Sequence, residues 1–380
     1  MRVGIDIRRS GEYGVGIYIR NLVRSLGRVG PEHEFVVIGR REHLQEFGEL
    51  PPNFGFEPYD RRFDAAVSHM TYGSGLAGLA LDVLHMPHRW VPMSAPRPYV
   101  VTLHDINTVL FPGEADGVRL KRIRDSLLVR GLRRAAVTMA VSEATKRDAI
   151  LRLKLPADRF QVVYQAVDEE VATPVHDDER NRVLERYSIE DPFVLYAGRI
   201  QPHKNVPRLI EAFAVARSQV EQDWRYRNLK LVVIGDDLSR YPEVRRSVMR
   251  TRIQDSVRFL GFVPVETLRV FYASASVFLF PSLYEGFGMP PLEAMAHGTP
   301  VVTSNTSSIP EAVGDAAVSV NPENVFDIAR GLRQVLTGEV DNGELVERGF
   351  KQVKRFSWDQ TAEQVISVYR RALTGLAGPA

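Results

Sequence analysis

The chain contains no cysteine in its 380 residues. This absence excludes disulfide bonds, cysteine-ligated zinc and a thiol nucleophile, and it fits a reducing compartment. The chain also lacks an excess of charge, because 49 Lys and Arg oppose 47 Asp and Glu and leave a net charge of +2. No general attraction to nucleic acid is therefore expected. No apolar run approaches the roughly 18 residues of a membrane-spanning helix, and residues 1–6 read directly as a strand rather than as a signal peptide. We expect a cytoplasmic protein whose contact with a membrane, if it makes one, is peripheral.

The length favours two domains. Short apolar segments alternate with helical ones, and several, such as 231–234, are continuously apolar, as expected for parallel strands covered on both faces. This alternation predicts an α/β protein with doubly wound sheets. The predicted strands are 2–7, 34–39, 83–86, 99–104, 137–141, 160–164, 193–197, 229–234, 257–260, 277–280, 300–303 and 317–320.

A charged, proline-containing stretch interrupts the alternation between 168 and 191. We interpret it as the junction of two Rossmann-like domains, with an N-terminal domain at 1–170, a linker at 171–190 and a C-terminal domain at 191–357. The final segment, 358–373, carries apolar residues at helical spacing and predicts a helix with one buried face.

The most informative stretch, 281–302, follows the predicted strand 277–280. Its loop contains Gly286 and Gly288, and a helix is predicted from Pro290 to Ala296. A glycine loop that leads into a helix N-terminus can bind an anion through backbone amides. Glu285 and Glu293, eight positions apart, supply carboxylates that accept hydrogen bonds from hydroxyls. The combination favours a ligand that carries both phosphate and sugar.

Three further segments follow predicted strands, at the edge where open α/β sheets bind ligands. Arg199 and Lys204 come after strand 193–197, and two fixed cations there could neutralise a diphosphate. The sequence Gly14-Val15-Gly16 precedes a predicted helix at 17–26, and His104 ends strand 99–104. We expect these segments to converge on one cleft.

With these motifs the chain resembles the retaining, nucleotide-sugar-dependent glycosyltransferases of family 4 (glycosyl transferases group 1), in particular bacterial mannosyl- and glucosyltransferases of surface polysaccharide assembly. The family has the GT-B fold, in which two Rossmann-like domains face each other across a cleft and the last helix, here 359–375, crosses back to the N-terminal domain. The resemblance covers nearly the whole chain and rests on the 285–293 motif, Gly198-Arg199, Lys204-Asn205, Gly14-x-Gly16, His104-Asp105, 142–145, 305–311 and 356–358.

The resemblance implies a role for each matched residue. Arg199 and Lys204 would hold the donor diphosphate and stabilise charge on the leaving phosphate. Glu293 would bind the ribose hydroxyls, and His104 would line the sugar pocket. The loop Gly14–Gly16, including Val15, would lie against the diphosphate. The remaining residues would grip the donor sugar and phosphate: Glu285, Gly286, Phe287, Gly288, Met289 and Pro290. The resemblance implies catalysis by charge and positioning, without a metal or other cofactor.

Other interpretations have less support in the residues. Gly14-x-Gly16 partly matches the dinucleotide fingerprint of dehydrogenases, but Ile19 stands where the third glycine belongs. Asp236-Asp237 follows a strand and could suggest a metal, yet the histidines show no metal-ligand spacing. A nucleotide-sugar epimerase, a phosphorylase and a non-catalytic nucleotide-sugar binding subunit remain alternatives.

Basic residues cluster between 119 and 154, where eleven Lys and Arg oppose three acidic residues, and Arg20, Arg24 and Arg28 recur at four-residue spacing. A solvated face is the ordinary interpretation, and peripheral docking on anionic lipid is the sharper hypothesis. We therefore predict a retaining hexosyltransferase. It would move a hexose, with a lean toward mannose from GDP-mannose, from a nucleotide diphosphate sugar to a hydroxyl of a glycan or lipid-linked acceptor.

Overall fold

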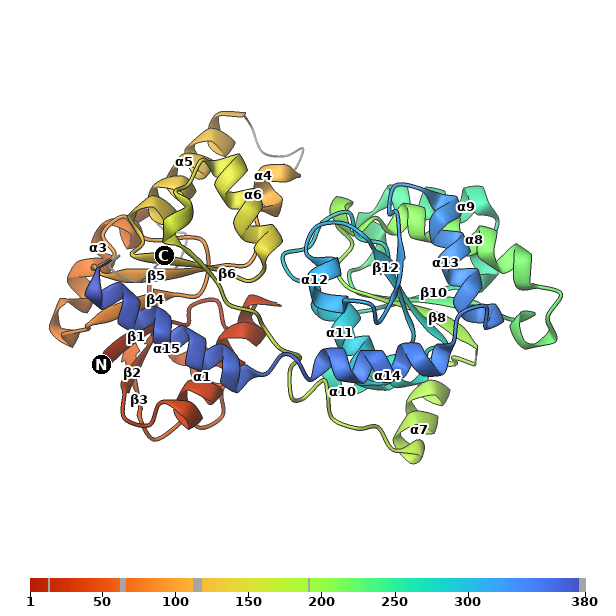
Figure 1. The fold of residues 1–380 in the computed structure, drawn as a ribbon, viewed down its shortest axis with the longest axis horizontal. Coiled ribbons are helices and arrows are strands. Elements are labelled where there is room, and N and C mark those ends of the chain that lie inside the picture. The colour runs from red at the N-terminus through yellow and green to blue at the C-terminus, as the bar shows by residue number, and fades with distance from the viewer. Residues whose placement is uncertain (13, 62–65, 112–117, 191, 376–380) are drawn as a thin grey trace. The chain divides into compact units, whose positions relative to one another are not determined.

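The computed structural model describes residues 1–380 except 13, 62–65, 112–117, 191 and 376–380, and the side chains of 66, 68 and 118–122 are also left undescribed. The chain divides into two compact units, Met1–Ala166 with Phe356–Ala380, and Val167–Arg355 (Figure 1). Most of the stretch 171–190, expected as a linker, is structured, because it contains helix α7 (Asp177–Tyr187), which packs against α10 (Val265–Ser274) of the second unit. Asp191, at the end of the predicted junction, lies outside the described residues.

The first unit is built on a parallel sheet of seven strands in its described residues, in the order β3-β2-β1-β4-β5-β6-β7. The strands are β1 (Arg2–Asp6), β2 (Glu34–Gly39), β3 (Phe54–Pro58), β4 (Val83–Met86), β5 (Tyr99–Leu103), β6 (Val137–Ala140) and β7 (Phe160–Val162). The order reverses between β1 and β4, so ligands of a sheet with this topology bind outside the carboxyl ends of those two strands.

Helices cover this sheet, and the last helix of the chain is one of them. Figure 1 shows α15 beside α1, with which it packs closely. Trp358, Val365 and Tyr369 of α15 are buried in the core of the first unit. The final helix therefore returns to the N-terminal domain, as predicted. The helices are α1 (Val15–Val29), α2 (Arg41–Leu44), α3 (Ala66–Leu76), η1 (Ala77–Leu79), α4 (Asn107–Leu110), α5 (Val118–Arg134), α6 (Glu143–Leu153), η2 (Ala157–Arg159) and α15 (Trp358–Thr374).

The second unit repeats the same topology with six described strands, in the order β10-β9-β8-β11-β12-β13, all parallel. Its switch point lies between β8 and β11. The strands are β8 (Phe193–Ala197), β9 (Lys230–Ile234), β10 (Val257–Gly261), β11 (Val277–Phe280), β12 (Val301–Ser304) and β13 (Val318–Val320).

The helices of the second unit pack on both faces of this sheet. They are α7 (Asp177–Tyr187), η3 (Pro202–Lys204), α8 (Val206–Val220), η4 (Trp224–Tyr226), η5 (Leu238–Arg240), α9 (Pro242–Thr251), η6 (Gln254–Ser256), α10 (Val265–Ser274), α11 (Met289–Ala296), α12 (Ile309–Val313), α13 (Val325–Thr337) and α14 (Asn342–Val353).

The structure confirms the predicted fold class, two α/β units on parallel sheets, and each predicted strand is present to within two residues at its ends. One strand, β3, was not predicted. It lies at the edge of the first sheet and, among the described residues, pairs only with β2. Its sequence contains Gly55 and ends at Pro58, residues that argue against a strand interior but are tolerated at an edge.

Candidate active site

Lys204 and Glu285 form a close ion pair at the switch point of the second sheet. The Lys204 Nζ lies 2.7 Å from Glu285 Oε1 and 2.8 Å from Oε2, although the residues are 81 positions apart. Lys204 ends the turn η3 after β8, and Glu285 lies in the loop after β11, the strand that pairs with β8. The side chains are 14% and 10% exposed, so the pair is shielded but reachable. A ligand phosphate could replace Glu285 as the ion-pair partner of Lys204, and a ligand hydroxyl could then donate a hydrogen bond to the Glu285 carboxylate.

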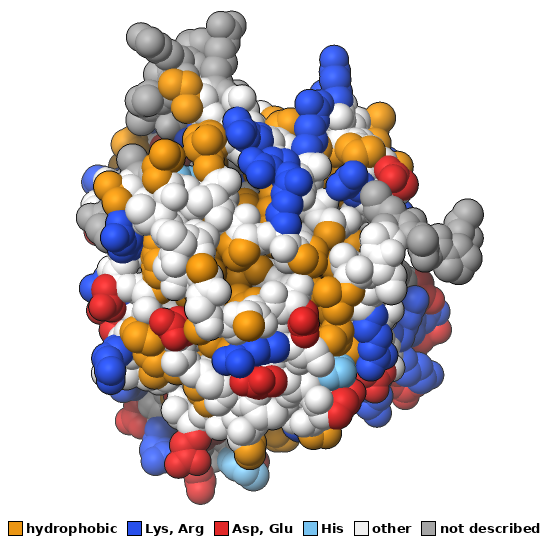
Figure 2. All heavy atoms as spheres, turned by 90° about the vertical axis from the view of Figure 1, so that its left-hand side faces the viewer, with side chains coloured by type: hydrophobic (Ala, Val, Ile, Leu, Met, Phe, Trp, Pro, Cys, Tyr) orange, Lys and Arg blue, Asp and Glu red, His pale blue; other side chains and the backbone are white. Residues whose placement is uncertain are grey.

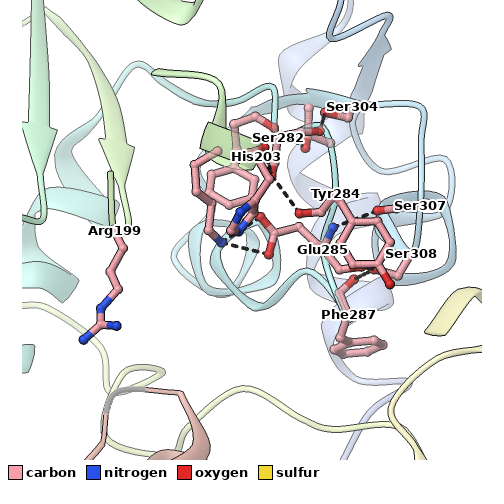
Figure 3. A network of polar contacts seen from close by, with 12 residues as sticks. Arg199, His203, Ser282, Tyr284, Glu285, Phe287, Ser304, Ser307 and Ser308 are labelled. Atoms are coloured by element: carbon pink, nitrogen blue, oxygen red, sulfur yellow. Dashed lines mark hydrogen bonds and ion pairs between the residues drawn. The ribbon is translucent and has the colours of Figure 1, made fainter. Parts of the chain in front are cut away.

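Serine side chains hold the Glu285 loop in place (Figure 3). The Glu285 amide donates to Ser307 Oγ at 2.9 Å. The buried Ser308 Oγ lies 2.8 Å from the carbonyl oxygens of both Glu285 and Phe287, and its single proton serves one of them at a time. Ser282 Oγ bonds the His203 carbonyl at 3.0 Å and so ties the loop to the turn that carries Lys204. Glu285 is thus fixed from both neighbouring loops.

Two features of the structure favour asparagine at position 205, directly after Lys204. Its backbone has φ 62°, the left-handed conformation that asparagine tolerates better than most residues. Its buried amide donates to the carbonyl oxygens of Pro281 at 2.9 Å and Pro322 at 2.7 Å. It therefore joins the β8 loop to the ends of β11 and β13. The sequence motif contains Asn205, but its supporting role was not predicted.

The N-terminus of α11 lies directly after the Glu285 loop. Gly288 precedes the helix with φ 120°, which disfavours any residue with a Cβ, and Pro290 and Pro291 occupy its first turn. No side chain caps this end, and because Pro290 and Pro291 have no N–H, the backbone donors it offers to an anion are the amides of Gly288 and Met289. Phe287 is buried against the loop, whereas Gly286, Met289 and Pro290 are partly exposed. The structure starts this helix at Met289, one residue before the prediction.

Arg199 is the exposed cation of the site. It follows β8, and its side chain extends away from the Glu285 network in Figure 3. The Arg199 carbonyl accepts a hydrogen bond from Tyr196 at 2.9 Å, which fixes the backbone while the guanidinium stays exposed. The structure therefore brings Lys204 and Glu285 together, but leaves Arg199 apart from them.

Glu293 lies one turn into α11 and is only 5% exposed. Burial raises the pKa of its carboxyl to about 7, and the negative charge of Asp168 adds to this effect. Tyr272 of α10 donates a hydrogen bond to Glu293 Oε2 at 2.8 Å. Glu293 is thus a nearly buried carboxyl close to Lys204, not the helix-surface residue that its position alone suggests.

In the first unit, Gly14, Val15 and Gly16 form the start of α1. Gly14 precedes the helix with φ 82°. A Cβ on Gly16 would lie 2.0 Å from the Ser10 carbonyl oxygen, so only glycine allows the loop after β1 to pass this close to the helix. The helix begins at Val15, two residues before the prediction.

His104 follows β5, and both of its ring nitrogens have partners within the first unit. Nε2 lies 3.0 Å from the Pro87 carbonyl oxygen and is therefore assigned the proton, and Nδ1 lies 3.3 Å from the Gln165 amide nitrogen. Burial lowers the pKa of His104 to about 4, so the ring is neutral. A sugar hydroxyl could bind Nδ1 only by displacing Gln165.

A second ion pair, which was not predicted, occupies the switch point of the first sheet. Arg8 bonds Asp6 at the end of β1, with 2.6 Å between Nη2 and Oδ2, and their side chains are 1% and 0% exposed. Tyr72 donates to the same Asp6 oxygen at 2.8 Å, and the Arg8 guanidinium lies over the rings of Tyr59 and Tyr72. Burial would raise the pKa of Asp6, but Arg8 outweighs it and holds that pKa below its usual range. The only sequence signal is the order Asp-Ile-Arg after a strand.

No three His, Asp or Glu side chains among the described residues come together as a metal site would require, and the absence of a metal from the reaction stays a prediction. No helix in the described part of the chain combines the length and apolar character needed to span a bilayer.

Two family models match the chain. The model described as Glycosyltransferase Family 4 matches residues 13–171, and the model described as Glycosyl transferases group 1 matches residues 178–352. The O-antigen chain mannosyltransferase B of Escherichia coli is 33% identical over 294 residues, which are 76% of this chain and 74% of that protein. The chain is a family 4 glycosyltransferase.

Another relative agrees with this assignment, and solved structures agree with the fold. The serotype-specific mannosyltransferase WbdA of Escherichia coli is 35% identical over 63% of this chain, a match that covers 29% of the longer WbdA. The structure of Anabaena HepE in complex with UDP-glucose superimposes with a TM-score of 0.75 at 16% identity, covering 97% of this chain and 99% of that one. Sucrose-phosphate synthase from Thermosynechococcus elongatus gives 0.74 at 20% identity, with 98% and 99% covered. At these identities the structures support the GT-B fold alone.

Proposed function

We propose that the chain is a retaining hexosyltransferase. It moves a hexose, with mannose from GDP-mannose favoured, from a nucleotide diphosphate sugar to a hydroxyl of a glycan or lipid-linked acceptor. The observation that carries the proposal is the Lys204–Glu285 pair at the switch point of the second sheet, close to the uncapped N-terminus of α11. The lean toward mannose is supported by relatives named as mannosyltransferases.

The proposed donor site uses charges of both signs for different parts of one ligand. The diphosphate binds Arg199, Lys204 and the backbone amides of Gly288 and Met289, because these groups supply two cations and N–H donors at the start of α11. Once Lys204 turns to the diphosphate, Glu285 is released to accept hydrogen bonds from sugar hydroxyls. Glu293 accepts from the ribose hydroxyls. His104 and the Gly14–Gly16 loop are proposed to contribute from the first unit.

In the proposed reaction the bond between the sugar and the leaving diphosphate breaks as the acceptor hydroxyl attacks the same face of the sugar. The donor phosphate takes the acceptor proton, so no protein base is needed. The protein contributes fixed positive charge at the oxygen where negative charge develops, which is the kind of preorganised stabilisation that lowers such barriers most. No metal is required in this scheme.

Binding of the donor nucleotide tests the proposal first. We expect one of GDP, UDP, ADP, dTDP and CDP to raise the melting temperature without added metal, since a ligand at 100 times its Kd stabilises by about 2.7 kcal/mol. GDP is the expected winner. A failure of all five to shift the melting temperature would count against a nucleotide-sugar site. NMR of the anomeric carbon in the product then tests retention, and donor conversion without acceptor would instead indicate an epimerase.

We also propose that the enzyme works in the cytoplasm and contacts an anionic membrane peripherally. Exposed basic residues on α5 and α6 support this, together with Ile123 and Leu151, which are 51% and 67% exposed. Figure 2 shows Lys and Arg side chains gathered in the upper part of one face, at the height of these helices in Figure 1. The exposed basic residues are Arg130, Arg133, Arg147, Arg152 and Lys154. Arg119, Lys121 and Arg122 of the predicted cluster lie outside the described side chains.

Two of the three arginines in the predicted row on α1 have carboxylate partners, so the membrane proposal is based on α5 and α6 rather than on this row. Arg28 pairs with Asp359 of α15 at 2.7 Å, and Arg20 lies 3.3 Å from Glu46. Co-sedimentation with vesicles tests the membrane proposal, and binding must be stronger to anionic than to neutral vesicles. Equal binding to both, or binding to neither, would contradict it.

A further inference from the structure

Tyr272 and Glu293 form a buried hydrogen bond between two helices beside the proposed donor site. Tyr272 lies on α10 and is 1% exposed, and its hydroxyl donates to Glu293 Oε2 of α11 at 2.8 Å. Among the described residues the other carboxylate oxygen, Oε1, has no hydrogen-bond partner. The bond therefore fixes one oxygen of Glu293 and leaves the other to a ligand.

The tyrosine itself is held firmly. Its ring stacks on His297 with 6.1 Å between centroids and packs edge-on against Phe278 at 5.3 Å. His297 is anchored in turn, since its Nε2 lies 2.6 Å from the Val171 carbonyl oxygen. The Thr299 hydroxyl donates to the Tyr272 carbonyl oxygen. A side chain whose ring is stacked on one neighbour, packed edge-on against another and fixed at its backbone can hold its partner in a single orientation.

The charges around Glu293 make this bond more important than one at the surface. Burial and Asp168 both disfavour the ionised carboxyl, whereas the bond from Tyr272 and the positive charge of Lys204 favour it, so that its pKa is about 7. A hydroxyl donates more strongly to an ionised than to a neutral carboxyl. Tyr272 thus supports both the orientation and the charge that Glu293 needs in order to bind a hydroxyl.

We propose that Tyr272 is a positioning residue for ribose recognition: it fixes the Glu293 carboxylate so that Oε1 faces the vicinal hydroxyls of the donor nucleotide. This inference rests on the proposed function, because it requires Glu293 to bind the ribose. Tyr272 does not touch the donor. Its phenol acts only through Glu293.

The test compares two ligands on two proteins. Isothermal titration measures the Kd of GDP and of 2′,3′-dideoxy-GDP for the wild type and for Tyr272→Phe, or of the corresponding pair if another base wins the thermal-shift panel. We expect the wild type to prefer the ribose form. The substitution should reduce that preference about five- to tenfold, the scale of one ordinary hydrogen bond, while the affinity for the dideoxy form stays unchanged.

The pH dependence gives a second readout. The ratio of the two affinities cancels the titration of the phosphates, which both ligands share, and leaves that of Glu293. In the wild type the preference for ribose should rise with pH through about 7, as the carboxyl ionises. Without the tyrosine hydroxyl the ionised form loses support, so in Tyr272→Phe the midpoint should move to higher pH. The groups that face this carboxyl or its partner are Asp168, Lys204 and His297.

Tyr226→Phe is the matched control. Its hydroxyl bonds the Leu336 carbonyl oxygen at 2.5 Å in the same unit, so its loss should leave the ribose preference unchanged. An equal loss of affinity for both ligands in Tyr272→Phe would indicate a merely structural tyrosine and overturn the inference. A wild type that binds both forms equally would also overturn it but would leave the diphosphate site intact. No binding of any nucleoside diphosphate would instead refute the proposed function.

Discussion

The two units share one topology and each has an ion pair at its switch point, yet the two pairs differ in exposure. Asp6 and Arg8 are enclosed, with 0% and 1% of their side chains exposed, and aromatic rings cover the guanidinium. Lys204 and Glu285 remain reachable at 14% and 10%, beside a glycine loop and an exposed Arg199. The same edge of the same fold therefore carries a structural pair in one unit and a candidate ligand site in the other.

The difference follows from what surrounds each pair. The Asp6 carboxylate already receives hydrogen bonds from Arg8 and Tyr72, so little capacity remains for a ligand. The Lys204–Glu285 pair has loops around it whose serines bond only backbone, which leaves both charged groups able to exchange partners. Charged residues at a switch point therefore do not by themselves indicate a ligand site; the charged groups must also be accessible to a ligand.

Breaking the enclosed pair should give the largest effect on folding. Asp6→Asn leaves the Arg8 charge buried without its counterion, a change that typically costs about 3–5 kcal/mol. Hydrogen exchange of the intact protein should show lost protection in the first unit and little change in the second. Asp223→Asn, which breaks the exposed pair with Arg225, is the control and should change stability little. Unchanged protection in Asp6→Asn would mean that the buried pair does not hold the first unit together.

Breaking the reachable pair should affect turnover instead. Lys204→Ala and Arg199→Ala should each lower kcat by about 100-fold or more, the scale of one preorganised charge. Arg199→Ala should leave folding nearly unaffected because its side chain is exposed, whereas Lys204→Ala also leaves Glu285, 10% exposed, without its counterion and should cost some stability. Lys351→Ala, an exposed lysine on α14, serves as the control. Near-normal turnover in both site variants, with a hexose donor and its acceptor, would refute the assigned site.

The sequence alone could separate the two units and locate most strands, because apolar runs and turn residues mark them. It could not identify the edge strand β3, because the glycine and proline in that strand are residues that argue against a strand. It also predicted Lys204 and Glu285 as binders of different ligand groups, without their pairing. That contact depends on β8 and β11 being neighbours, and strand order is a property of the whole sheet. Tyr272 gave no signal, since a tyrosine on an apolar helix face indicates core packing.

Acid should affect the two units in opposite directions. Burial lowers the pKa of His85 and His88 to about 3, so these rings stay neutral in the folded first unit but become protonated below about 6.5 once it unfolds. The unfolded state then binds more protons, and stability falls as the pH falls, by up to about 1.4 kcal/mol per pH unit for each ring. Glu293 has the opposite effect, because its raised pKa makes the folded second unit bind a proton between about pH 7 and 4.5.

Urea unfolding at pH 7 and pH 5 checks this contrast. Tryptophan fluorescence reports mainly on the first unit, since Trp358 is buried there whereas Trp224 of the second unit is 85% exposed even when folded. The fluorescence midpoint should fall at pH 5, while circular dichroism of the second unit's transition should not fall with it. Midpoints that drop together would show that other groups of the second unit outweigh Glu293, among them His297, whose pKa burial lowers.

The smallest effects should come from two buried serines, one in each unit. Ser142 Oγ accepts from the Thr145 amide at the start of α6, and its loss should cost about 1 kcal/mol of stability. Ser308→Ala removes a hydroxyl of similar burial that holds the Glu285 loop, so its cost in stability should be similar. Only Ser308→Ala should also weaken binding of the nucleoside diphosphate, by a few-fold, because only the Glu285 loop contains residues that are proposed to bind the ligand. Equal nucleotide affinity in the two variants would show that the Glu285 loop keeps its conformation without Ser308. The exposure of the charged groups alone would then explain why only the second unit has a candidate ligand site.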